Sequence, residues 1–295
     1  FQLRLMEHIL SLHADLRNRT YRHGPYQHFR IADPKPRDIH KANVRDRLLH
    51  HALCRKFCPF FDRTFISDSF SCRLGKGTHR AMNRFRAFAY KASCNHTTTA
   101  WVLKCDIRKF FANIDHRVLL SILAQYIPDA DILRLLKNIV GSFSSETSTV
   151  CPFARNPSVR RLAALFTKER IRGIGLPLGN LTSQLLVNIY MNEFDQFVKH
   201  RLKAKYYIRY ADDFVILSHE RPEHERWLPL IETFLQGRLK LLLHPDKVCT
   251  KTLASGVDFL GWVHFPSHRV LRTATKRRMW RRLEEKPERI VIESY

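Results

Sequence analysis

Two adjacent aspartates between two short apolar runs constrain the fold of this chain more than any other feature. Residues 206–210 and 214–217 are typical of buried strands, and Ala211, Asp212 and Asp213 join them. The pattern predicts a hairpin that carries acids at its tip. Aspartate is also common in exposed turns, so an ordinary surface turn is the alternative interpretation.

A third acid makes the surface turn less attractive. Asp106 ends another apolar run, residues 101–107. Helices are expected from Asp115 to about Tyr126, over 181–202 and over 223–239, and a further strand near 248–252. This order is that of a split βαβ plan with one inserted helix, in which the first strand lies beside the hairpin. The three carboxylates would then meet at one end of a sheet.

Converging carboxylates suit divalent metal ions. Charged groups beside apolar strands cost folding free energy unless something compensates them. Phosphoryl transfer from a nucleoside triphosphate uses two divalent ions roughly 4 Å apart, and hard Mg²⁺ prefers oxygen ligands. The three aspartates therefore predict a site for two Mg²⁺ ions, with Mn²⁺ as a substitute.

The charge of the chain indicates a polyanionic partner. Lys and Arg number 51 against 27 Asp and Glu in 295 residues, which gives a net charge of +24 spread along the sequence. An acidic membrane surface is the alternative, but no run of about 18 apolar residues is present. Seven scattered cysteines without a CxxC pair favour reduced thiols, so a cytoplasmic location is expected.

The remaining pattern predicts an α+β chain. Basic amphipathic helices are expected over 44–57 and after Thr78, a loop-rich stretch over about 140–172, a hairpin over 259–265 and a strongly basic helix over 274–285.

These motifs together resemble one known family. Tyr-Ala-Asp-Asp at 210–213, with Asp106 followed five positions later by Phe111, resembles the palm of reverse transcriptases, and the resemblance covers roughly residues 44–265. It implies a right-hand polymerase fold with fingers, a palm built on the split βαβ antiparallel sheet, and a short helical thumb. The implied boundaries are 1–100 for amino-terminal helices and fingers, 101–258 for the palm with a finger-type insertion at about 140–172, and 259–295 for the primer-grip hairpin and the start of the thumb.

The resemblance also implies roles for single residues. Asp106 and Asp212 match the principal metal ligands, Asp213 matches the third acid, and Ile107 joins the metal set. Lys247 matches a lysine near the departing pyrophosphate.

Other matched residues would contact the nucleotide and the primer. Phe111 matches a steric gate that excludes a ribose 2′ hydroxyl, with simple core filling as the alternative. Arg73 and Lys76 lie in a segment that resembles the fingers near the template and the incoming nucleotide. Leu260, Gly261 and Trp262 resemble the primer grip, with an ordinary core hairpin as the alternative.

Residues 175–184, Gly-Leu-Pro-Leu-Gly-Asn-Leu-Thr-Ser-Gln, are the most discriminating block. Most reverse transcriptases carry Pro-Gln-Gly where this chain has Pro177, Leu178 and Gly179. At the end of the block this chain has Ser183 and Gln184, where group II intron enzymes usually have Ser-Pro. With Gly-Lys-Gly-Thr-His at 75–79, the block resembles reverse transcriptases of diversity-generating retroelements. Leu178, Gly179 and Gln184 would line the nucleotide pocket, and Leu178 would tolerate copying errors at adenines.

This resemblance implies several partners. They are a template-repeat RNA, a cDNA primer strand, deoxynucleoside triphosphates and an oligomeric accessory variability determinant protein. The alternatives are a group II intron, retron or phage-defence reverse transcriptase, or an RNA-binding scaffold without catalysis.

Overall fold

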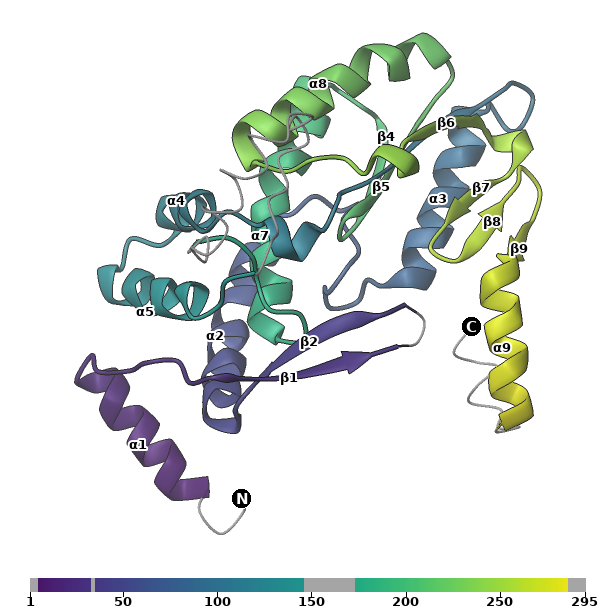
Figure 1. Ribbon diagram of the computed structural model, residues 1–295. Coiled ribbons are helices and arrows are strands. Elements are labelled where there is room, and N and C mark those ends of the chain that lie inside the picture. Colours follow the sequence, from purple (N-terminus) through teal and green to yellow (C-terminus); the bar gives the residue numbers. More distant parts are fainter. Residues whose placement is uncertain (1–4, 33–34, 146–172, 286–295) are drawn as a thin grey trace, which may run out of the picture. The chain divides into compact units, whose positions relative to one another are not determined.

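The computed structural model describes residues 5–32, 35–145 and 173–285 (Figure 1). The chain folds into two compact units whose segments alternate along the sequence. Unit 1 takes its described residues from 1–65, 107–194 and 233–242, and unit 2 from 66–106, 195–232 and 243–295.

Unit 1 is mainly helical and includes a two-stranded antiparallel ribbon. Its elements are α1 (Leu5–Arg17), β1 (Tyr26–Ile31), β2 (Arg37–Ala42), α2 (Val44–Asp62), a 3₁₀ turn (Phe110–Asn113), α4 (His116–Tyr126), α5 (Ala130–Gly141) and most of α7 (Leu181–Gln196). Helices α2, α4 and α5 bury leucine, isoleucine and phenylalanine side chains, and the rings of Phe61 and Tyr126 meet edge to face at 5.5 Å. Burial of these apolar faces stabilises the unit.

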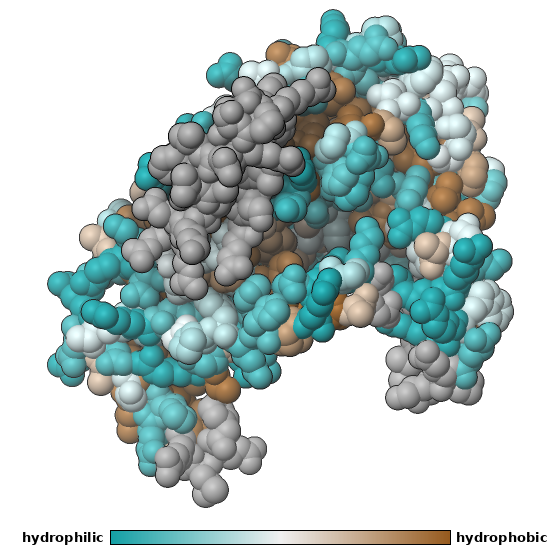
Figure 2. Space-filling view, viewed as in Figure 1, coloured by the Kyte–Doolittle hydropathy of each residue, from teal (hydrophilic) through white to brown (hydrophobic). Residues whose placement is uncertain are grey.

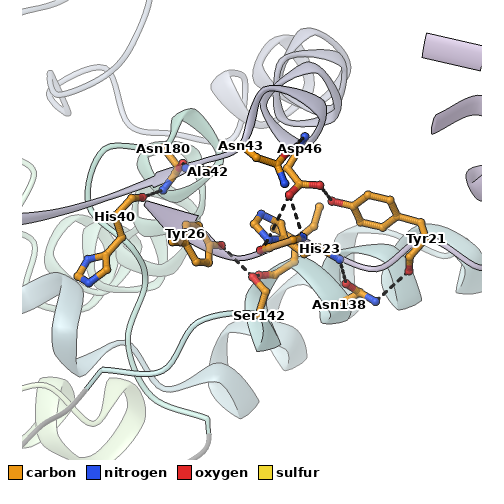
Figure 3. Close-up of polar contacts among 12 residues, drawn as sticks. Tyr21, His23, Tyr26, His40, Ala42, Asn43, Asp46, Asn138, Ser142 and Asn180 are labelled. Carbon is orange, nitrogen blue, oxygen red and sulfur yellow. Dashed lines mark hydrogen bonds and ion pairs between the residues drawn. The ribbon is translucent and has the colours of Figure 1, made fainter. Parts of the chain in front are cut away.

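A buried carboxylate fastens the segment before β1 to α2. Asp46 accepts hydrogen bonds from the Tyr21 hydroxyl at 2.7 Å and from the Gly24 amide at 2.9 Å, and Asn43 caps the helix by accepting from the Asp46 amide (Figure 3). On the other side, Asn138 of α5 accepts from the His23 amide at 3.1 Å. These contacts hold the entry to the ribbon against two helices.

Unit 2 contains a four-stranded antiparallel sheet in the order β4-β5-β3-β6. Its strands are β3 (Trp101–Asp106), β4 (Tyr206–Tyr210), β5 (Asp213–Ser218) and β6 (Cys249–Thr252). Side chains alternate between the two faces of a strand. Val102, Ile208, Val215 and Leu217 therefore share one face, and α3 (Thr78–Ala92) packs on it through Phe85, Phe88 and Ala89.

A second, three-stranded sheet follows the first in unit 2. Its strands are β7 (Val257–Phe259), β8 (Trp262–His264) and β9 (Arg269–Leu271), and α9 (Thr273–Glu285) comes after it. The unit also holds a π-helical turn (Phe197–Arg201), 3₁₀ turns (Pro245–Lys247 and Leu253–Ser255) and the first part of α8 (Arg221–Leu239). The surface over α9 is largely hydrophilic (Figure 2), because this helix carries Lys276, Arg277, Arg278, Arg281 and Arg282.

The expected α+β class and the strand order are confirmed. The expected strands near 101–107, 206–217 and 248–252 form the sheet, and the helix expected from Asp115 begins there, with Asp115 accepting from the Arg117 and Val118 amides. The sequence interpretation missed α1, the β1–β2 ribbon, α5 and β9. The long helix expected over 181–202 is regular only to Gln196 and then forms the π-helical turn.

Of the expected insertion at about 140–172, residues 146–172 lie outside the described residues. The boundaries expected at 100 and 258 stay predictions. No helix in the described parts of the chain is long and apolar enough to cross a membrane.

Candidate active site

Two of the three predicted acids face each other across the sheet of unit 2. In the antiparallel register Asp106 of β3 lies opposite Asp213 of β5, and Lys104 lies opposite Val215. Because side chains alternate along a strand, Asp106, Asp213 and Lys104 lie on the α3-covered face, where the apolar packing ends. Asp212 lies in the turn immediately before Asp213. The three carboxylates are thus brought to one end of the sheet.

Asp213 is the most perturbed of these acids. Its side chain is 23% exposed, and its Oδ1 is buried without a hydrogen-bond partner. The pKa of the Asp213 carboxyl is raised to about 7, chiefly by burial; Lys104 lowers it, and the nearby charges of Asp106, Asp212 and Asp258 contribute to the rise. A buried oxygen with no donor and a neighbouring set of negative charges are what a cation would satisfy.

Two lysines lie beside the acids. Lys247 Nζ donates to Asp106 Oδ2 at 3.0 Å, so the structure brings this sequence-predicted residue to the acid cluster. Lys104 Nζ lies 3.9 Å from Asp213 Oδ2 and donates to the Asp258 carbonyl of β7 at 2.6 Å. Lys104 therefore links the acids to the second sheet. Sequence reasoning missed it, although its position two residues before Asp106 places it on the same face.

A strained two-residue turn presents Asp212. Tyr210 pairs with Asp213, so Ala211 and Asp212 form the connection, and Ala211 has a φ of 56°. That left-handed conformation costs a non-glycine residue roughly 1–2 kcal/mol. Strain of this kind at a functional tip is maintained by the surrounding structure.

Replacing Ala211 by Gly is expected to raise the free energy of unfolding by about 1 kcal/mol, because glycine adopts positive φ without the Cβ penalty. Urea denaturation measures the change. Ala87→Gly is the matched control, since Ala87 is an exposed residue inside α3, where glycine is expected to destabilise by about 1 kcal/mol. A loss of stability in both variants would contradict strain at Ala211.

A buried ion pair supports the same turn. Arg209 Nε and Nη2 donate to the two oxygens of Asp195 at 2.8 and 2.7 Å, and both side chains are fully buried. Tyr207 also donates to Asp195, while Arg209 Nη1 donates to the Ala211 carbonyl at 3.1 Å. Arg209 thereby fixes the turn that carries Asp212. The signal for it was a charged residue inside an otherwise apolar strand, and sequence reasoning missed its meaning.

The donor set fits divalent ions. The oxygens of Asp106, Asp212 and Asp213 are hard ligands, and the unpartnered Asp213 Oδ1 has unused capacity to accept. Within the described residues no three His, Cys, Asp or Glu side chains already adopt a metal-binding arrangement. Ile107 has a buried apolar side chain, so only its carbonyl oxygen offers a ligand, and its metal role stays a prediction.

The predicted primer-grip residues form a tight hairpin. Phe259 of β7 pairs with Trp262 of β8, and Leu260 and Gly261 between them have φ values of 52° and 84°. Positive φ at both central positions is typical of a type I′ turn. Leu260 packs against the core of unit 2, which explains how a leucine is kept in this conformation. The hairpin is confirmed, and its role at a primer stays a prediction.

The predicted nucleotide-binding block lies in unit 1. The His40 amide of β2 donates to the Leu178 carbonyl at 3.0 Å, and Asn180 bonds to both His40 and Ala42 (Figure 3). Gly179 has a φ of 99°, and a Cβ there would lie 2.7 Å from Ile39. The turn at 178–179 is therefore held closely against β2.

Phe111 and Gln184 lie in the same unit. The Phe111 carbonyl accepts from the Leu176 amide at 2.8 Å, which brings the predicted gate residue to the 175–184 block. The Phe111 ring is half-buried and meets Phe110 edge to face, while Gln184 is half-buried in the first turn of α7.

Arg73 and Lys76 hold their own loop together. Arg73 donates to the carbonyls of Ile66 and Ser69 at 2.6 and 3.0 Å, and Lys76 donates to the carbonyl of Ser67 at 2.7 Å. Their contacts with a nucleotide stay a prediction.

An antiparallel sheet with paired acids at one end is typical of nucleotidyl-transferring polymerases. Comparison with known proteins gives the family: the profile of the reverse transcriptase (RNA-dependent DNA polymerase) family matches residues 32–264. The chain belongs to this family of RNA-directed DNA polymerases, which bind template RNA and deoxynucleoside triphosphates and generally use divalent ions such as Mg²⁺.

Individual relatives agree with this family. Protein YkfC of Escherichia coli is 25% identical, and the match covers 93% of this chain and 74% of YkfC. The group II intron-encoded protein LtrA of Lactococcus lactis is 22% identical, and the match covers 87% of this chain and 49% of LtrA. The chain thus spans about half of LtrA.

Solved structures agree with the fold. Telomerase from Candida albicans, in a complex with a fragment of telomeric RNA, has a TM-score of 0.54 at 11% identity. The likeness covers 86% of this chain and 47% of the telomerase chain. Apo telomerase from Candida tropicalis, truncated from its C-terminal domain, has a TM-score of 0.57 at 9% identity, and the likeness covers 90% of this chain and 60% of the telomerase chain. These likenesses support the right-hand polymerase fold alone.

Proposed function

We propose that this chain copies a template-repeat RNA into DNA in a diversity-generating retroelement, and that Asp106, Asp212 and Asp213 bind the divalent ions of the reaction. The observation that carries the metal site is the pairing of Asp106 with Asp213, whose buried Oδ1 has no hydrogen-bond donor. The ions supply activation of the primer 3′ hydroxyl and neutralisation of the leaving pyrophosphate.

The neighbouring residues have assignable tasks in this proposal. Lys104, held by the Asp258 carbonyl, orients the Asp213 carboxylate. Lys247 stands beside Asp106 as a cation for the departing pyrophosphate, and the bidentate Arg209–Asp195 pair holds the turn that presents Asp212. Phe111 excludes a ribose 2′ hydroxyl, Arg73 and Lys76 contact the nucleotide, and Leu260, Gly261 and Trp262 hold the primer end.

Leu178 is the residue on which the proposed diversity-generating retroelement subtype rests. Its backbone is fixed by the His40 amide, so the position of its side chain is defined by β2 rather than by a free loop. An apolar leucine offers no hydrogen bond where a glutamine would, which weakens the discrimination of the pocket between correct and incorrect base pairs. Copying becomes error-prone through this loss, and the concentration of errors at adenines is what the resemblance to diversity-generating retroelement enzymes implies.

The variant Leu178→Gln is expected to lower the adenine error frequency about two- to ten-fold, since one restored hydrogen bond contributes roughly 0.5–1.5 kcal/mol. Sequencing of cDNA made on a defined RNA template measures it. Leu178→Met keeps an apolar side chain of similar volume and is expected to leave the frequency unchanged. Unchanged adenine errors in the glutamine variant would refute the role of Leu178.

A group II intron-type reverse transcriptase is the second candidate function, favoured by the similarity to LtrA. The two candidates differ in their genomic surroundings and partners. Two near-identical repeats that differ chiefly at adenines, together with an accessory variability determinant, would support the retroelement. Intron RNA flanking the gene would support the intron enzyme.

A further inference from the structure

Two adjoining hollows lie in unit 2 between α3 and the segment 264–269 that joins β8 to β9. Their volumes are about 110 and 460 Å³, and they share Arg86, Pro266 and Ser267. Figure 1 shows α3 beside the three-stranded sheet, and ring contacts between Phe85 and both Phe259 and His264 join the two elements. None of the three catalytic aspartates lines either hollow.

The floor of the smaller hollow is rigid. Phe85 and Ala89 are buried in the core of unit 2, and His264 is 3% exposed with its ring centroid 4.6 Å from that of Phe85. Core side chains of this kind are close-packed and do not rearrange freely. The hollow is therefore formed before any ligand enters.

Its rim carries uncompensated positive charge. Arg86 is exposed and forms no hydrogen bond or ion pair with any residue that the structure describes, whereas its neighbour Arg84 is paired with Asp68 at 2.7 Å. Arg269 reaches Asn83 only at 3.4 Å and covers the Trp262 ring at 5.0 Å. No acidic residue is among the described residues that line the two hollows. Such a rim attracts a phosphate group.

Aromatic groups lie next to these cations. Tyr90 is 47% exposed, and the edge of His96 meets its ring at 5.3 Å. On the opposite side His268 stacks on Phe265 with ring centroids 4.8 Å apart. An exposed aromatic ring such as that of Tyr90 beside arginines is the combination that binds unpaired bases along a phosphate backbone. An acidic peptide would use the arginines but not the flat rings.

We propose that the two adjoining hollows, which together we term the α3 pocket, bind a single-stranded segment of RNA outside the catalytic site. Arg86 and Arg269 contact phosphates, and Tyr90 stacks on a base at the mouth. The choice of RNA over DNA rests on the proposed function, because the RNA template is the long single strand that this reaction requires.

The test measures RNA binding and DNA synthesis separately. Binding of a labelled, unstructured RNA of about 12 nucleotides is measured by fluorescence anisotropy. Excess unlabelled primer–template duplex is present to occupy the catalytic site. The Arg86→Gln and Tyr90→Leu variants are each expected to weaken binding about three- to ten-fold, and Arg86→Gln to lower the salt dependence by about one phosphate contact. Extension of a short primer–template is expected to stay unchanged in both variants.

Arg226→Gln is the matched control. Arg226 is an exposed helical arginine on α8 of the same unit and lines neither hollow. An equal loss of binding in Arg226→Gln, or unaltered binding in Arg86→Gln and Tyr90→Leu, would overturn the α3 pocket. A DNA strand of the same sequence that binds as tightly, with the same dependence on Arg86, would overturn the assignment to RNA. These outcomes do not depend on catalysis, so a chain inactive in synthesis still tests the pocket.

Discussion

The variant Asp213→Asn is expected to lose primer extension by about a thousand-fold or more, on the order of 4 kcal/mol of transition-state stabilisation. An amide cannot replace a negatively charged metal ligand, and the buried Oδ1 of Asp213 has no other partner in the described structure. Single-turnover extension with saturating nucleotide measures the loss. Glu225→Gln is the control, because Glu225 is an exposed acid on α8 that pairs with Arg221.

The same substitution is expected to stabilise the metal-free protein. The pKa of Asp213 rises from 3.8 to about 7 on folding, so between these pH values the folded protein binds more protons than the unfolded chain. The free energy of unfolding therefore falls as the pH rises from about 4 to 7. Asp213→Asn removes this loss. Relative to the wild type, its free energy of unfolding is expected to be about 2–4 kcal/mol higher above pH 7 and equal below pH 4. Urea denaturation in a chelator at pH 4 and pH 8 measures it; equal stability of the two proteins at pH 8 would contradict a buried, uncompensated carboxylate.

Breaking the buried pair of Arg209 and Asp195 is expected to have the largest effect on stability. Arg209→Met leaves the carboxylate of Asp195 buried without its bidentate partner, which costs about 3–5 kcal/mol. Urea denaturation gives the change. Primer extension is expected to fall as well, because Arg209 also holds the Ala211 carbonyl of the turn that carries Asp212.

A double-mutant cycle separates the pair from simple packing. The combined variant Arg209→Met, Asp195→Leu is expected to recover part of the lost stability, since no charge is then left unpaired. Arg238→Met is the comparison at an exposed pair: Arg238 lies 3.4 Å from Glu193 with its side chain 56% exposed, and the expected change is below about 1 kcal/mol. A loss at Arg209 no larger than that at Arg238 would show that the buried pair does not hold the turn.

The sheet was predictable because its strands combine two local signals. Residues 101–106 and 206–218 are short apolar runs, and the acids stand where the runs end, so periodicity and composition agree. The β1–β2 ribbon lacks this agreement. Its strands are mostly exposed, with polar residues on both faces, and no apolar alternation distinguishes them from a loop.

The candidate site was predictable only in its charged ligands. Asp106, Asp212 and Asp213 stand out from apolar neighbours, and Lys247 was found by resemblance. Lys104 and Arg209 stand out locally as charges in apolar strands, but their partners could not be predicted. Lys104 contacts Asp258, which is 154 residues away, and Arg209 contacts Asp195, which lies on a different element. The α3 pocket likewise needs α3, which ends at Ala92, side by side with the segment that begins at His264.

Primer extension by the purified chain tests the central claim most directly. A DNA primer annealed to an RNA template is incubated with deoxynucleoside triphosphates and Mg²⁺, beside reactions with a chelator and with Asp106→Asn. The predicted result is full-length cDNA in the wild-type reaction alone, with Mn²⁺ able to replace Mg²⁺. Extension that survives the chelator or the loss of Asp106, or a wild-type chain that binds the duplex but incorporates no nucleotide, would contradict a metal-dependent reverse transcriptase.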